Sequence, residues 1–253
     1  MTATTMKDLI DAGLHFGHET RRWNPKMAPY LWGQSNGIHI IDLRQTVRLL
    51  DDAINFVRQA VADGGKILFI GTKKQARNSI AQHAESAGMP YVNFRWLGGM
   101  LTNFQTIRQR ISYMKELESE ENSGEMQSRP KKERLRLRRD LQKLRQSLGG
   151  VRDLQELPAG VFVIDVNAEE TAVREAVRLG IPIVALVDSN CNPEPITYVI
   201  PGNDDAIRSA ELLCSLVAGA CQEGKEMANK KKKAKKEPSS EGSAPRSRSR
   251  SSR

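Results

Sequence analysis

The stretch KILFIGTKKQARNSIAQHAESAGMPYVNF (residues 66–94) decides the fold class. It opens with KILFIG, a short continuous apolar run bounded by turn residues, which predicts a strand buried on both faces. A helix is expected from residue 73 to about residue 87, ended by Gly88 and Pro90, and residues 91–94 predict the next strand. A strand, a helix and a second strand in succession indicate a parallel sheet that helices cover on both sides.

The same alternation extends in both directions along the chain. Upstream, apolar residues at steps of three and four predict a helix over residues 44–64. Downstream, apolar runs at residues 160–165, 181–188 and 197–202 predict strands, and helices are expected at residues 168–179 and 204–223. The predicted fold is therefore α/β, a doubly wound parallel sheet built from residues 1–103 and 149–224.

Residues 104–148 have a different pattern and predict an inserted antiparallel helical hairpin of coiled-coil type. Two helical stripes of apolar residues are separated by the polar segment ESEENSGEMQSRP (residues 118–130). Neither helix can bury its stripe alone, so the two are expected to pack on each other. The outward positions of the second helix carry Arg134, Arg136, Arg138, Arg139, Lys143 and Arg145. A charged outer face of this kind is either merely solvated or contacts a partner.

The net charge of +9, from 39 Lys and Arg against 30 Asp and Glu, is unevenly distributed. Residues 225–253 hold seven Lys and four Arg against three Glu and have few apolar residues, which predicts a disordered basic tail. Residues 1–150 have a net charge of +9 and residues 151–224 of −8. The acidic segment is therefore expected to face away from any nucleic acid that the basic part binds.

Composition also limits the compartment. No run approaches the roughly 18 apolar residues of a membrane span, and the polar opening MTATTMKDLIDAG lacks a secretory signal, so no membrane partner is expected. The odd number and irregular spacing of Cys191, Cys214 and Cys221 fit neither a disulfide framework nor a zinc cluster. We expect these thiols to be inert in a reducing cytoplasm.

A nucleotide-dependent enzyme is one functional hypothesis. In the predicted strand-to-helix turn Gly71-Thr72-Lys73-Lys74, backbone N–H groups and two ammonium groups would meet at a helix N-terminus, which is an anion-binding arrangement. The sequence nevertheless contains neither G-x-x-x-x-G-K-[ST] nor G-x-G-x-x-G. A phosphate site of this generic kind would serve an RNA backbone as well as a nucleotide.

Two basic segments favour RNA binding instead. HETRRWNPKMAPY (residues 18–30) and NFRWLGGMLTNFQTIRQR (residues 93–110) interleave cations with aromatic and amide side chains. Cations neutralise phosphates, and planar groups stack on splayed bases. The alternative for Trp23 and Trp96 is that they are core residues that anchor the loops. The candidate RNA-binding residues are Arg21, Arg22, Trp23, Lys26, Lys73, Lys74, Arg95, Trp96, Asn103, Arg108 and Arg110.

A metal site is a more speculative candidate. His15 and His18 are three residues apart and could share a metal with a carboxylate such as Asp188, Asp204 or Asp205. The preferred set is His18, Asp188 and Asp205, with zinc as the ion, and no cofactor is otherwise required. The alternative is that the two His only form hydrogen bonds or stack, because H-x-x-H by itself has little specificity.

The motifs RWLGGMLTN (residues 95–103) and VIPGNDDAIR (residues 199–208) are highly specific. Together with GLHFGHETRRWNPKMAPYLWG, GKILFIGTKKQA and LGIPIVALVDSN, they make residues 1 to about 224 resemble the bacterial form of the small-subunit ribosomal protein two family. The Arg-rich second hairpin helix and the basic tail depart from what is typical of that family.

This resemblance implies a flavodoxin-like sheet with an inserted helical hairpin and a structural, non-catalytic role. It also implies binding to ribosomal RNA within the small ribosomal subunit in the cytoplasm, beside neighbouring ribosomal proteins, and help in docking ribosomal protein one for translation. A scaffold that binds only proteins through the hairpin remains the third hypothesis.

Overall fold

The computed structural model describes residues 5–236 of the chain, with side chains up to residue 231. Its main sheet has five parallel strands in the order β5-β4-β6-β7-β8. This order places the first strand of the sheet between the second and the third, as in flavodoxin-like folds. The α/β class and the parallel sheet are thus confirmed. The strands are β4 (Ile67–Ile70), β5 (Tyr91–Val92), β6 (Gly160–Ile164), β7 (Ile183–Val187) and β8 (Tyr198–Pro201).

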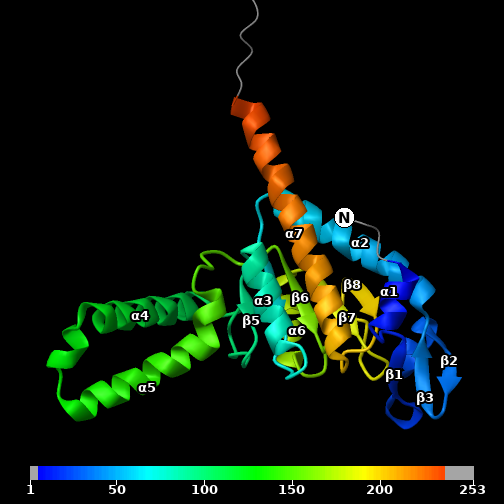
Figure 1. Ribbon diagram of the computed structural model, residues 1–253, viewed down its shortest axis with the longest axis horizontal. Coiled ribbons are helices and arrows are strands. Elements are labelled where there is room, and N and C mark those ends of the chain that lie inside the picture. The colour runs from blue at the N-terminus through cyan, green and yellow to red at the C-terminus, as the bar shows by residue number, and fades with distance from the viewer. Residues whose placement is uncertain (1–4, 237–253) are drawn as a thin grey trace, which may run out of the picture.

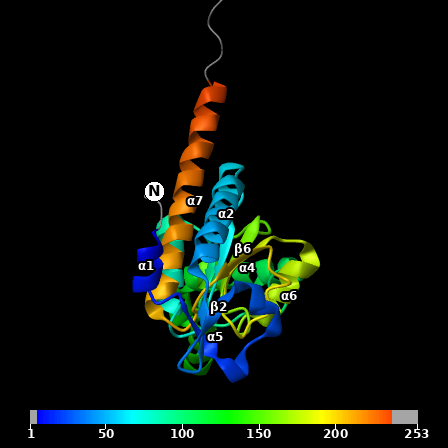
Figure 2. The ribbon, with the colours of Figure 1, turned by 90° about the vertical axis from the view of Figure 1, so that its right-hand side faces the viewer.

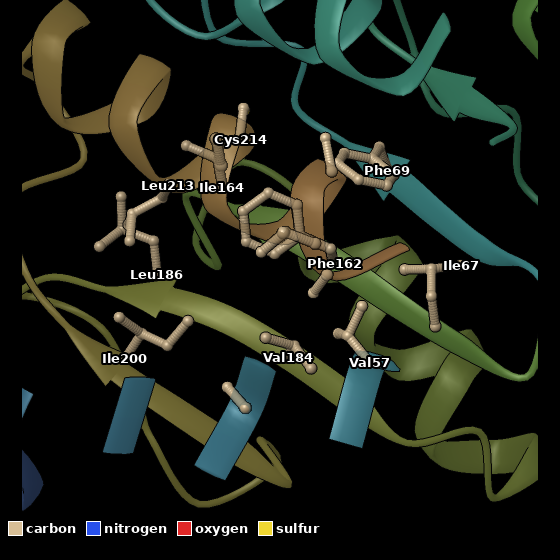
Figure 3. Packing of buried hydrophobic residues seen from close by; sticks show 14 of the residues in the cluster. Val57, Ile67, Phe69, Phe162, Ile164, Val184, Leu186, Ile200, Leu213 and Cys214 are labelled. Carbon is tan, nitrogen blue, oxygen red and sulfur yellow. The ribbon is translucent and has the colours of Figure 1, made fainter. Parts of the chain in front are cut away.

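One face of this sheet is covered by α2 (Leu43–Ala62), α3 (Arg77–Ala87) and α7 (Ile207–Lys236). Figure 3 shows Phe69 and Phe162 on neighbouring strands of this face, and their rings meet edge to face with centroids 5.4 Å apart. Val57 of α2 and Leu213 of α7 belong to the same buried cluster. Because every residue of β4, β6 and β7 is buried, these strands read as continuous apolar runs.

The opposite face packs against α6 (Glu170–Leu179) and the base of the helical hairpin. The alternate strand residues, such as Leu68 and Val163, point to this side. Residues from both hairpin helices, Ile107 and Leu148, join the same core. The hairpin is therefore continuous with the main core at its base.

The hairpin consists of α4 (Phe104–Ser123) and α5 (Lys131–Leu148). Figure 1 shows the two helices side by side, projecting beyond the β5 edge of the sheet. Ion pairs tie them together: Arg145 of α5 lies 2.9 Å from Glu118 and 3.0 Å from Glu121 of α4. Arg145 is therefore exposed, as expected, but paired across the hairpin, whereas Arg138 and Lys143 are exposed with no ion pair among the described residues.

Several predicted boundaries differ from the structure by a few residues, and two of them, on either side of α3, have a clear physical cause. The helix expected from Lys73 begins at Arg77, because residues 73–76 form a turn in which the Lys73 carbonyl accepts hydrogen bonds from the N–H groups of Ala76 and Arg77. The strand expected over residues 91–94 ends at Val92. Asn93 donates a side-chain hydrogen bond to the Arg77 carbonyl, and Phe94 packs under the Arg77 guanidinium, so both residues leave the sheet.

A three-stranded antiparallel sheet near the N-terminus was not predicted. It has the order β1-β3-β2, with β1 (Phe16–Glu19), β2 (Leu31–Ser35) and β3 (Ile38–Ile41), and it follows the short helix α1 (Met6–Asp11). Most residues of β2 are exposed, so the apolar alternation that signals a strand is absent there. The overlooked signal was Asn36-Gly37, which forms the β2–β3 turn with φ values of 50° and 77°.

The last helix corrects the predicted tail. In Figures 1 and 2, α7 passes beside α2 and continues well past the body of the molecule. Residues 225–236 are thus helical and not disordered, because Lys and Ala favour a helix and Lys is favourable near a helix C-terminus. Lys225 Nζ donates a 2.6 Å hydrogen bond to the Ala87 carbonyl, and Lys231 lies 3.3 Å from Asp63. The remainder of the predicted tail, residues 237–253, lies outside the described residues.

The three cysteines are free and buried. Burial raises the pKa of the Cys191 and Cys221 thiols to about 12, so both stay protonated at neutral pH. Within residues 5–236, none of the helices combines the length and the apolar character that crossing a bilayer requires.

Candidate nucleic-acid interface and the adjoining carboxylate cluster

The N-terminal basic surface comprises Arg21, Arg22, Trp23 and Lys26. Arg21 and Arg22 lie on the 3-10 turn η1 (Thr20–Arg22), and Lys26 lies on a second 3-10 segment, η2 (Pro25–Tyr30). A hydrogen bond of 2.8 Å from the Asn24 N–H to the Ser189 carbonyl ties the segment between them to the main sheet. These basic groups are therefore presented by a loop that is fixed to the body.

Not all of these groups are equally free to contact a partner. Arg21 Nε donates to Glu19 Oε2 at 2.7 Å, and Lys26 pairs with Glu194. The Trp23 ring packs on His39 with centroids 5.1 Å apart and stays 38% exposed, so it is an anchor with one accessible side. Arg22 is exposed.

The loop between β5 and α4 is organised by one buried carboxylate, Glu175 of α6. Its Oε1 accepts hydrogen bonds from Trp96 Nε1 at 3.0 Å and from the Gly99 N–H at 2.7 Å. Its Oε2 accepts from the N–H groups of Leu101 and Thr102, both at 3.0 Å, and from the Thr102 hydroxyl at 3.1 Å. Burial works against ionisation, but these hydrogen bonds outweigh it and lower the pKa of Glu175. The loop is thus held rigidly around a permanent negative charge.

Sequence reasoning missed Glu175. The available signal was a charged residue on the apolar stripe of a predicted helix, three residues after Ala172 and directly before Ala176, both buried. A carboxylate at such a position must find donors inside the protein, because an unpaired buried charge is very costly.

The hairpin-root surface comprises Arg95, Asn103, Arg108 and Arg110, which the organised loop and the start of α4 present to solvent. Asn103 Oδ1 accepts a 2.9 Å hydrogen bond from the Thr106 hydroxyl. Trp96 is half-buried and bonded to Glu175, so its position favours the anchoring role over stacking on a base. Figure 1 places this surface and the N-terminal basic surface at opposite ends of the five-stranded sheet, so the two are separate patches, and Lys73 and Lys74 belong to neither.

Lys73 lies elsewhere, at the carboxyl ends of the strands where the strand order reverses. Its Nζ is 2.6 Å from both Asp204 Oδ1 and Asp205 Oδ1 and 3.2 Å from Asp165 Oδ2. The neighbouring Thr72 N–H donates to Glu169 Oε1 at 2.7 Å. Ligands commonly bind in the crevice at this point of such sheets, but here the chain's own carboxylates occupy the donors of the turn.

The surroundings of Lys73 do not favour its predicted role in binding phosphate. The turn that was expected to bind phosphate already holds carboxylates, and a phosphate would meet repulsion from them. Lys74, the next residue, is exposed and stays available.

The charges of this carboxylate cluster perturb one another. Burial, together with the neighbouring Asp165 and Asp188, raises the pKa of Asp204 to about 7. Burial disfavours the ammonium form of Lys73, but its hydrogen bonds to Asp204 and Asp205 outweigh burial and raise its pKa. Asp204 Oδ2 is buried and has no hydrogen-bond partner in the described part of the chain. The cluster thus contains one carboxylate oxygen that could accept a proton or a cation.

His18 joins this cluster from β1. Its Nδ1 lies 3.1 Å from Asp188 Oδ1 and its Nε2 lies 3.4 Å from Asp205 Oδ2, so the three predicted metal ligands are close together. The hydrogen bond to Asp188 raises the pKa of His18. Among the described residues, two groups have ligand atoms that all lie within 4.8 Å of one another, and both contain Asp204 in place of Asp205: His18, Asp188 and Asp204, and Asp165, Cys191 and Asp204. His15 lies outside both groups and packs on Phe16, with ring centroids 4.0 Å apart.

Some carboxylates of the acidic segment lie inside the protein and cannot face a partner. Within the acidic segment, residues 151–224, four carboxylates are buried. These four are held inside the protein by Lys73 and by hydrogen bonds from backbone N–H groups, and the other eight carboxylates of the segment are not buried. The buried four are Glu169, Glu175, Asp188 and Asp204.

Comparison with known proteins agrees with this architecture. The family model described as ribosomal protein S2 matches residues 9–224. The chain is 56% identical over 224 residues to proteins named small ribosomal subunit protein uS2 from Mycolicibacterium gilvum, Mycobacteroides abscessus and Mycolicibacterium vanbaalenii. These matches cover 88% of the chain and 80%, 81% and 82% of the three relatives. The chain therefore belongs to the ribosomal protein S2 family and is a structural, non-enzymatic protein of the small ribosomal subunit, which acts in translation in the bacterial cytoplasm.

Proposed function

We propose that the protein binds ribosomal RNA of the small subunit through the N-terminal basic surface and the hairpin-root surface. The observation that carries this proposal is the loop held by Glu175, which presents exposed cations at fixed positions before any partner binds. Such preorganisation lowers the entropic cost of association. The cations grip phosphates, and the separation of the two surfaces makes the protein select RNA by shape more than by sequence.

A filter-binding series with a small-subunit RNA fragment tests the proposal. The double substitution Arg21→Ala with Arg22→Ala should weaken binding and reduce the slope of log affinity against log salt by about one unit per lost phosphate contact. Arg22 should contribute more than Arg21, which is already paired with Glu19. A matched control is Arg48→Ala with Arg178→Ala, which removes the same charge from exposed positions outside both surfaces. Equal effects of the two double variants would contradict the proposal.

We also propose that the protein helps dock ribosomal protein one, through a groove beside the edge strand β8. This cavity of about 910 Å³ is lined by aromatic residues, among them Phe56 and Tyr198, whose stacked rings lie 4.5 Å apart. Asp52, Glu194 and Lys26, which is paired with Glu194, also line it, so its mixture of aromatic and acidic groups suits a polypeptide better than phosphate. Leu49→Arg in the wall of this groove should weaken binding of purified ribosomal protein one at least tenfold and leave RNA affinity unchanged. Unchanged binding of ribosomal protein one would rule out this groove.

A third proposal is that the carboxylate cluster can hold a divalent cation such as zinc. It is supported by the convergence of His18, Asp188 and Asp204 and by the unpaired buried oxygen of Asp204. Because the Lys73 ammonium already sits beside Asp204, a cation would have to share the negative charge of the cluster with it. Metal analysis after dialysis against a chelator and then zinc should find about one zinc per chain, and His18→Ala should abolish it. If the unsubstituted protein kept no stoichiometric zinc, the site would be excluded.

A further inference from the structure

A cavity of about 470 Å³ lies where the hairpin meets the body. Its walls come from the loop at residues 97–103, the first two turns of α4 that follow it, and the last two turns of α5. This volume falls within the range of ordinary small-molecule sites. The cavity is therefore large enough for one nucleotide.

The side chains that line this cavity favour an anion. Arg110 of α4 and Lys143 of α5 supply two cations, and Thr106 and Ser147 supply hydroxyl groups. Among the described residues, no Asp or Glu lines it.

Four other cavities of the described chain differ in this respect, because each has carboxylates in its walls. The groove beside β8, for example, contains Asp52 and Glu194, and a cavity on the outer side of α5 contains Glu133 and Asp140. Cations that no carboxylate neutralises within the same cavity distinguish the one at the hairpin root.

The same cavity also has an apolar part. Leu97 of the loop, Ile107 of α4 and Leu144 of α5 line it beside the cations. The ideal position of a Cβ atom on Gly98 has nothing within 4 Å, so the loop is open at this point. A ligand with one charged end and one flat apolar end matches this combination.

We propose that this cavity binds a single splayed-out nucleotide of RNA, with its phosphate between Arg110 and Lys143 and its base against Leu97 and Leu144. Unpaired nucleotides that leave the stack are the parts of RNA that proteins bind in this way. The inference rests on the proposed RNA binding and assigns one specific contact within it. Because the walls belong to both the body and the hairpin, the bound nucleotide would fix the angle at which the hairpin leaves the body.

Two variants of the full chain test the inference with the same small-subunit RNA fragment. Arg110→Gln with Lys143→Gln should lower affinity roughly tenfold or more and reduce the salt slope by up to about two units. Ser147→Phe fills the cavity without any change of charge and should lower affinity by a similar factor, which a diffuse electrostatic attraction would not explain. The charge-matched control, Arg48→Gln with Arg178→Gln, should change affinity less than about threefold. Circular dichroism and the thermal midpoint establish that each variant is folded.

Lysine acylation read by mass spectrometry provides a second measurement on the unsubstituted protein. RNA should protect Lys143 several-fold while exposed Lys7 of α1 stays reactive. If Ser147→Phe binds RNA normally and Lys143 stays reactive in the complex, the nucleotide site is wrong although RNA binding stands. If the unsubstituted protein fails to bind the RNA at moderate salt, the proposed function fails together with the site.

Discussion

Replacing Glu175 by Gln should loosen the loop at residues 96–102 and destabilise the whole protein. Each oxygen of Glu175 accepts at least two hydrogen bonds from that loop, and an amide group keeps only one of the two oxygens as an acceptor. At least two donors would then lose their acceptor. A buried donor without a partner costs about 1–3 kcal/mol, so the free energy of unfolding should fall by about 2–6 kcal/mol.

Urea denaturation measures that loss, and amide hydrogen exchange locates it. The N–H groups of Gly99, Leu101 and Thr102 should exchange faster in the variant, whereas amides of β6 should change only as far as global stability does. Glu170→Gln is the matched control, because Glu170 lies on the same helix, is exposed and forms only a weak ion pair with Arg174 at 3.8 Å. That control should cost less than about 0.5 kcal/mol. If both variants lose the same stability, or if the three loop amides exchange at the original rate, Glu175 does not organise the loop.

Three further predictions concern other parts of the molecule. The pKa of Asp204 is raised to about 7, so the folded protein favours its neutral form. The stability that the protonated carboxyl group gives the fold is complete below the unfolded pKa of about 3.8 and is lost as pH rises to about 7. The thermal midpoint should therefore fall between pH 4 and pH 7, and less steeply in Asp204→Asn; equal slopes would contradict this. Gly150→Ala would place a Cβ atom 2.3 Å from the Tyr91 carbonyl oxygen and should lower the free energy of unfolding, measured by urea denaturation, by about 3 kcal/mol. The control Gly149→Ala, whose Cβ atom would have nothing within 4 Å, should leave that free energy almost unchanged. Truncation after residue 224 removes the hydrogen bonds of Lys225 to α3 but no buried side chain up to residue 231. It should therefore lower the free energy of unfolding by about 1 kcal/mol or less and reduce the salt slope of RNA binding. A larger loss of stability would show that the end of α7 supports the fold.

Local patterns predicted most of the secondary structure correctly. The continuous apolar runs of β4, β6 and β7 and the stripes of α4 and α5 are visible in the sequence because burial on a sheet or on one face of a helix imposes a period on apolar residues. The N-terminal sheet escaped prediction because its strands are short and mostly exposed, so burial imposes no such period on them. The helical end of α7 escaped because its composition resembles that of a disordered chain, while its start is packed against α2 and α3.

The candidate site was predicted only in part. The sequence pointed to the basic loops by their composition and proposed His18, Asp188 and Asp205 as one group, and these three side chains do lie close together. It could not show that Lys73 is bound by internal carboxylates or that Trp96 is anchored to Glu175.

By itself, the sequence determined the α/β class, the order of the main strands and helices and the presence of a helical hairpin, since each follows from contacts between near neighbours along the chain. Only the tertiary structure decided which charged groups remain available to a partner. Lys73 and Asp204 are 131 residues apart, and they meet because parallel strands bring their carboxyl ends to one edge of the sheet. A charged side chain has no periodic signature that reveals its partner, so whether it faces solvent or another charge depends on how the strands and helices pack.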